Sequence, residues 1–163
     1  MNSFAQPFIL HLVFENYDNF FRNNAVDFFI IYVNHSNAKI INPKQSFTPY
    51  DVVKIQLNAL KNNGTSKKDM GIKQVWLFAH PENKNFTGPY ARFRAMLYGE
   101  QYKILLNHNS HKINLIMNSE KKNIYKVEIL TDDKELFFYE WHVKKGSDNK
   151  CNNCWFTSAV SIP

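Results

Sequence analysis

The spacing of apolar residues changes once along this chain, near Asn107, and that change limits the folds open to it. Before Asn107 the apolar residues recur three and four positions apart, which is typical of helices with one buried face. After Asn107 they alternate with polar residues, the period of half-buried strands. The sequence therefore predicts an α+β domain in which three helices pack against one face of a curved antiparallel sheet.

The first predicted helix has clear start and stop signals. Thr48 can cap the amide of Asp51, Pro49 suits the first helical position, and Gly64 suits the left-handed residue that ends a helix. A second helix is expected from Ile72 and ends at Pro81; a polar loop is expected over residues 82–86. A third helix is expected between Pro89 and Gly99.

Four strands are expected after Asn107, the longest over residues 136–144. Alternation places one set of its side chains against the helices: Phe137, Tyr139, Trp141 and Val143. The other set faces away from them: Leu136, Phe138, Glu140, His142 and Lys144. Two large apolar side chains on that outward face predict a homodimer through the sheet, unless residues 1–46 cover the same strip.

Composition bounds the class of protein. A chain of 163 residues is long enough for one domain with its own core. Its net charge of +6 comes from scattered lysine pairs rather than a basic run, so nucleic-acid binding is not expected. The apolar runs at residues 7–14 and 25–33 are far shorter than the ~20 residues of a membrane span. We expect residues 1–46 to form an aromatic-rich extension and residues 47–163 a single domain.

Helices followed by a meander resemble the cone-shaped, cystatin-like folds of the nuclear transport factor 2-like superfamily. Five blocks of sequence further resemble the family known as domain of unknown function 4864: Val52–Asn63, Trp76–Asn83, Thr87–Phe93, Tyr102 with Leu105–His108, and Cys154–Val160. The resemblance covers residues 50–163. It implies the cone fold and an intracellular protein, with a plastid location in plant members, but no particular reaction or ligand. The N-terminal extension resembles no transit peptide, so the compartment stays open.

Cys151 and Cys154 form a C-x-x-C pair, which can be a redox pair, half a zinc site or a structural feature. The pair precedes a terminal strand instead of a helix, and the further zinc ligands would have to be His108 and His111, which lack standard spacing. A structural role is therefore expected, with Cys154 facing the core. No metal and no cofactor are predicted.

A conical fold leaves a cavity between helices and sheet, and two functions compete for it. The first is non-catalytic binding of a small apolar ligand or a protein partner, with the expected cavity residues largely aromatic: Trp76, Tyr90, Arg92, Phe93, Tyr139 and Trp141. The alternative is an isomerase, cyclase or dehydratase that moves a proton with a histidine in the cavity. The catalytic candidates are His80, Tyr102 and His108, although His80 could simply stabilise a helix end.

Overall fold

A computed structural model describes residues 40–64 and 68–163. The chain divides into two units, residues 1–34 and 35–163, and all the described residues belong to the second. Most of the predicted extension, residues 1–39 of 1–46, lies outside the described residues. Its last residues are described: the side-chain amide of Gln74 bonds both backbone groups of Ile41, at 2.8 Å to its N–H and 2.7 Å to its C=O.

The first helix, α2 (Pro49–Lys61), begins as predicted. The Thr48 hydroxyl accepts a hydrogen bond from the Asp51 amide at 3.1 Å, and the Asp51 carboxylate accepts one from the Thr48 amide at 2.9 Å. This reciprocal pair satisfies two amides that the first turn would otherwise leave unbonded. Gly64 has the expected positive φ, +93°, but the residue that caps the end of the helix is Asn62, whose amide donates to the Asn58 carbonyl at 3.3 Å.

The helical part of the chain contains one element that was not expected. Helices α3 (Met70–Leu77) and α5 (Tyr90–Leu97) lie where two helices were predicted. Between them, residues 81–87 form α4 (Pro81–Thr87) instead of the predicted loop, so the described residues contain four α-helices rather than three. Pro81 begins this helix rather than ending the previous one, because a proline in the first turn loses no helical hydrogen bond. A 3₁₀ turn, η1 (Lys103–Leu105), leads toward the sheet.

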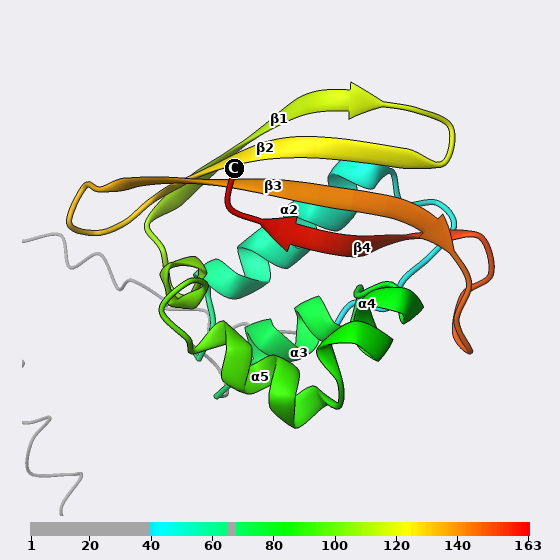
Figure 1. The fold of residues 1–163 in the computed structure, drawn as a ribbon, viewed down its shortest axis with the longest axis horizontal. Helices are drawn as coiled ribbons and strands as arrows, with labels where there is room; N and C mark the ends of the chain where they lie inside the picture. The colour runs from blue at the N-terminus through cyan, green and yellow to red at the C-terminus, as the bar shows by residue number, and fades with distance from the viewer. Residues whose placement is uncertain (1–39, 65–67) are drawn as a thin grey trace, which may run out of the picture. The chain divides into compact units, whose positions relative to one another are not determined.

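The expected meander is confirmed. Strands β1 (Ser110–Asn118), β2 (Lys122–Leu130), β3 (Leu136–Gly146) and β4 (Cys154–Ser161) form an open antiparallel sheet in that order. The helices lie on one side of this sheet, with α2 nearest the strands (Figure 1). The fold is therefore α+β.

The predicted faces of β3 are confirmed by burial. Tyr139, Trp141 and Val143 are buried against the helices, whereas Leu136 on the opposite face is 51% exposed. Helix α2 contributes Val53, Leu57 and other apolar residues to the same core. No helix among the described residues is long and apolar enough to cross a membrane.

One edge of the sheet continues into the segment between α3 and α4. Ala79 forms a parallel bridge with Thr157 of β4: the Thr157 amide donates to the Phe78 carbonyl at 2.8 Å, and the His80 amide donates to the Thr157 carbonyl at 2.8 Å. A bulge in β4 between the partners of His142 and Val143 lies beside this bridge. Together they bring the start of α4 alongside β4, where the two elements enclose a cavity.

Candidate functional site

A cavity of about 250 Å³ lies between α4, α5 and β4, with α2 and β3 at its inner end. Most of its lining side chains are apolar, including Leu60, Val75, Phe93, Met96, Leu97 and Leu105. Cavities that hold small molecules have this composition: apolar walls with a few placed polar groups.

Three polar side chains form a closed cluster at the inner end. The indole Nε1–H of Trp141 donates to Gln56 Oε1 at 3.1 Å and to Thr157 Oγ1 at 3.0 Å. The Thr157 hydroxyl donates to Gln56 Oε1, and the Gln56 amide nitrogen donates to the Val75 carbonyl at 3.2 Å. All three side chains are buried, and their bonding to one another offsets the cost of removing polar atoms from water.

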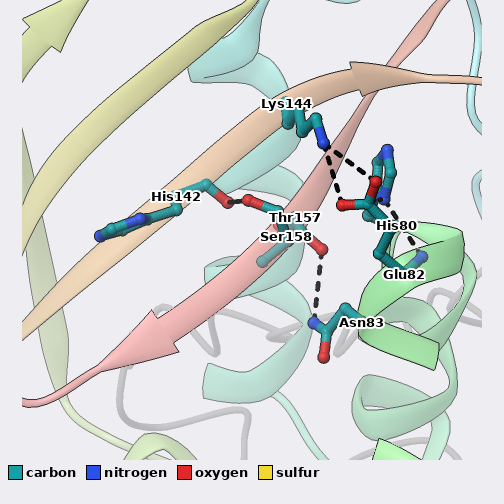
Figure 2. A network of polar contacts seen from close by, with 7 residues as sticks. All are labelled: His80, Glu82, Asn83, His142, Lys144, Thr157 and Ser158. Carbon is teal, nitrogen blue, oxygen red and sulfur yellow. Dashed lines mark hydrogen bonds and ion pairs between the residues drawn. The ribbon is translucent and has the colours of Figure 1, made fainter. Parts of the chain in front are cut away.

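Helix α4 forms the outer wall of the cavity. Figure 2 shows Glu82 and Asn83 of this helix facing β3 and β4. The Asn83 amide nitrogen donates to the Thr157 carbonyl at 3.4 Å, and the Glu82 carboxylate pairs with Lys144 of β3 at 2.9 Å. This ion pair holds the pKa of Glu82 below its ordinary value. Phe86 also borders the cavity, and its side chain is 86% exposed.

The predicted cavity residues separate into two groups. Phe93 and Trp141 line the cavity. The other four are not among its lining residues: Trp76, Tyr90, Arg92 and Tyr139. Trp76 packs outside it, with its ring 5.1 Å from Phe93 and the Lys84 ammonium 5.6 Å above it. Tyr139 is buried and donates to the Gln101 carbonyl at 2.8 Å, and burial raises its pKa to about 12.

The three catalytic candidates lie in different places. Tyr102 lines the cavity and donates its hydroxyl hydrogen to the Val160 carbonyl at 3.0 Å; burial raises its pKa. His80 is buried beside Phe156, and its Nδ1 accepts a hydrogen bond from the Glu82 amide at 3.2 Å. His80 therefore caps the start of α4, and the predicted role at the end of the preceding helix is wrong, because that helix ends at Leu77. His80 and His108 are not among the lining residues.

His108, between η1 and β1, bonds to His111 of β1. The Leu105 carbonyl, 2.8 Å from His108 Nδ1, can only accept, so this nitrogen carries a hydrogen. His108 Nε2 then accepts from His111 Nδ1–H at 2.7 Å, and a ring nitrogen that accepts belongs to a neutral His108. Burial lowers the pKa of both, that of His111 to about 4, with neighbouring His108 and Lys61 adding to the effect. Within the described ranges no third histidine, cysteine or carboxylate joins them to form a metal-binding group.

This pair should make stability depend on pH. Unfolded His111 titrates near its ordinary pKa and folded His111 near 4, so between these values the unfolded chain binds more protons. The stability that comes from keeping His111 neutral is therefore fully present above about pH 6.5, and it is lost as the pH falls toward 4. Urea unfolding at pH 7 and pH 4.5 should show a loss about 2 kcal/mol larger for the natural protein than for His111→Gln, allowing for partial exposure. Parallel pH dependences would contradict the assignment.

The two cysteines form a disulfide at the β3–β4 turn, with their Cα atoms 5.9 Å apart. Cys154 is fully buried, as expected, beside buried Phe156. The disulfide closes the turn next to Asp148, whose carboxylate accepts a hydrogen bond from the Cys151 amide at 2.9 Å.

The outward face of the sheet is partly covered by its own side chains. The Lys126 ammonium lies 4.5 Å from the centre of the Phe138 ring, and His142 pairs with Glu140 at 3.2 Å. Leu136 stays half-exposed. A homodimer through this face stays a prediction.

Sequence reasoning missed the polar residues that shape the cavity: Gln56, Glu82, Asn83 and Thr157. A signal for Gln56 was present, because it falls on the buried face of α2 between Val53 and Leu60. Glu82 and Asn83 were expected in a loop, and Thr157 reaches Gln56 across 101 positions of the chain. Single-sequence periodicity carries no information on such a contact.

No family model, curated protein or solved structure matches this chain. The resemblance to the domain of unknown function 4864 family and to the nuclear transport factor 2-like cone thus stays a prediction. The class of protein that the structure itself defines is an α+β domain with helices on one face of an open four-stranded sheet and a largely apolar cavity beneath its last strand.

Proposed function

We propose that this protein binds a small, mainly apolar molecule in the cavity between α4, α5 and β4. The observation that carries the proposal is a hollow whose walls are apolar and whose inner polar atoms already bond to one another. An apolar ligand gains from leaving water there, and it breaks no existing hydrogen bond of the protein.

The volume of the cavity limits the size of the ligand. An apolar cavity of about 150 Å³ in another protein holds benzene. A cavity of 250 Å³ therefore has room for a molecule of about two fused rings. A ligand of this size should bind with a Kd of about 10–500 µM.

The chemistry of the lining favours binding over proton transfer. A general base at neutral pH needs an imidazole or a tuned carboxylate close to the substrate. Among the described residues that line the cavity, the titratable groups are Tyr102 and Glu82. Burial raises the pKa of Tyr102 away from neutrality, and Glu82 is exposed and paired with Lys144.

Filling the cavity should abolish binding. Met96 lines the cavity, so Met96→Trp places an indole in the space the ligand needs. Titration of the full chain with indene, followed by NMR through the Trp141 indole N–H resonance, should give saturable shifts in the natural protein and none in this variant.

Ala95→Trp is the matched control, because Ala95 is exposed on the same helix and is not a lining residue. This variant should bind indene as the natural protein does. Equal binding by both variants would place the ligand elsewhere, and no saturable shift in the natural protein would remove the proposal.

A further inference from the structure

We propose that the natural ligand of this cavity carries a hydrogen-bond donor, such as a hydroxyl or ring N–H group, and no negative charge. The inference rests on the proposed function and deepens it. Several polar groups that line the cavity already donate their hydrogens within the protein, so they can only accept a hydrogen bond from a ligand.

The hydroxyl groups around the cavity have each given their single hydrogen to the protein. Thr87 donates to the Asn83 carbonyl at 2.8 Å, Tyr102 to the Val160 carbonyl at 3.0 Å, and Ser158 to the His142 carbonyl at 3.3 Å. A hydroxyl whose hydrogen is engaged can offer a ligand only its lone pairs. These groups therefore present acceptors to the cavity.

In the inner cluster, the hydrogens of Thr157 and Trp141 are likewise donated within the protein. The hydroxyl hydrogen of Thr157 and the indole hydrogen of Trp141 both point to Gln56 Oε1. The Gln56 amide donates one hydrogen to the Val75 carbonyl and keeps a second, and the whole side chain is fully buried.

Asn83, which lines the cavity, supplies a further acceptor. Its amide nitrogen is turned to β4 by the bond to the Thr157 carbonyl, which fixes the oxygen on the opposite side of the amide (Figure 2). No hydrogen bond to this oxygen occurs among the described residues, so it is open to a donor from the ligand. An amide oxygen accepts up to two such bonds.

The charged groups near the cavity also disfavour a negatively charged ligand. The charged side chain that lines it is Glu82, and Lys144, which neutralises Glu82, belongs to β3 and is not a lining residue. A carboxylate ligand would lose its hydration in a cavity whose described lining holds no Lys, Arg or His side chain to pair with it. A neutral donor instead meets a lining that includes the side-chain oxygens of Asn83, Tyr102 and Ser158.

Indole and indene test this inference, because they have nearly the same shape and differ in the ring N–H. The experiment measures the Kd of each by NMR titration, for the natural full chain and for Asn83→Leu. Loss of the acceptor should weaken indole binding about five- to tenfold and change indene binding by less than about twofold. Indole-3-carboxylate should bind the natural protein at least about tenfold more weakly than indole.

The outcomes separate the two proposals. If neither indole nor indene binds the natural protein, the proposed function fails. If both bind and Asn83→Leu weakens them equally, or if the carboxylate binds as well as indole, the cavity binds ligands but the donor inference is overturned. Unchanged indene binding also shows that the variant keeps its cavity.

Discussion

Replacing Trp141 with alanine should lower the free energy of unfolding by about 3–5 kcal/mol. The side chain is 1% exposed at the centre of β3, where it joins the core to the polar cluster of Gln56 and Thr157. Alanine removes the ring, leaves a void and takes the donor from two buried oxygens. Urea unfolding followed by far-UV circular dichroism measures the change.

Trp141→Phe is the control that separates the contribution of the aromatic ring from that of the indole N–H. Phenylalanine keeps an aromatic ring in the core and removes the indole N–H, so it should cost about 1–2 kcal/mol. An unfolding midpoint unaltered by Trp141→Ala would show that the indole does not lie in the core.

Gly71→Ala should destabilise the protein by about 3 kcal/mol, near the upper end for overpacking. A Cβ at this position would lie 2.1 Å from the carbonyl oxygen of Ala59 and 2.8 Å from its carbonyl carbon. These are backbone atoms of α2, so α2 and α3 would have to separate to make room. The same region holds the bond from the Ile72 amide to Asn63 Oδ1, at 3.2 Å.

Gly64→Ala gives a matched comparison for the effect of the extra methyl group. A Cβ at Gly64 would meet no atom within 4 Å, so its cost comes from the backbone φ of +93° alone. That cost is about 1 kcal/mol. Thermal and urea unfolding should rank Gly71→Ala well below Gly64→Ala in stability; equal losses would mean that the helices do not approach each other at Gly71.

Local chemistry explains which parts of the fold were predictable. The start of α2 depends on Thr48, Pro49 and Asp51, three neighbours whose interaction is visible in the sequence. The faces of β3 follow from strict alternation around Trp141. Such features need no knowledge of distant parts of the chain.

Helix α4 shows why other parts could not be predicted. None of its residues is buried, so it has no apolar stripe for a periodicity argument to detect. It forms because Pro81 fits the first turn and because the His80 ring accepts from the Glu82 amide. His80 itself is held by its backbone hydrogen bond to Thr157, which lies 77 residues further along the chain. A contact of this kind cannot be detected from neighbouring residues.

The candidate site was predictable to a similar, partial extent. Phe93 and Trp141 were expected in a cavity because each lies on an apolar face. Asn83 was not, since its position depends on α4 and on the carbonyl of Thr157 in another element. Aromatic composition could indicate a hollow but not which polar atoms would face it.

The two ends of α4 are held to the rest of the protein unequally. At its start, the His80 amide bonds to β4 and Glu82 is paired with Lys144. At its end, the Thr87 hydroxyl bonds back within the same helix, and the chain turns at Gly88 with a φ of +82°. The start of the cavity's outer wall is therefore bonded to two strands, whereas the hydroxyl of its last residue is bonded within the helix itself. In the proposed function, Phe86 and Asn83 border the same cavity from this one helix, so substitutions at the two positions test separately whether α4 affects the association rate and the affinity.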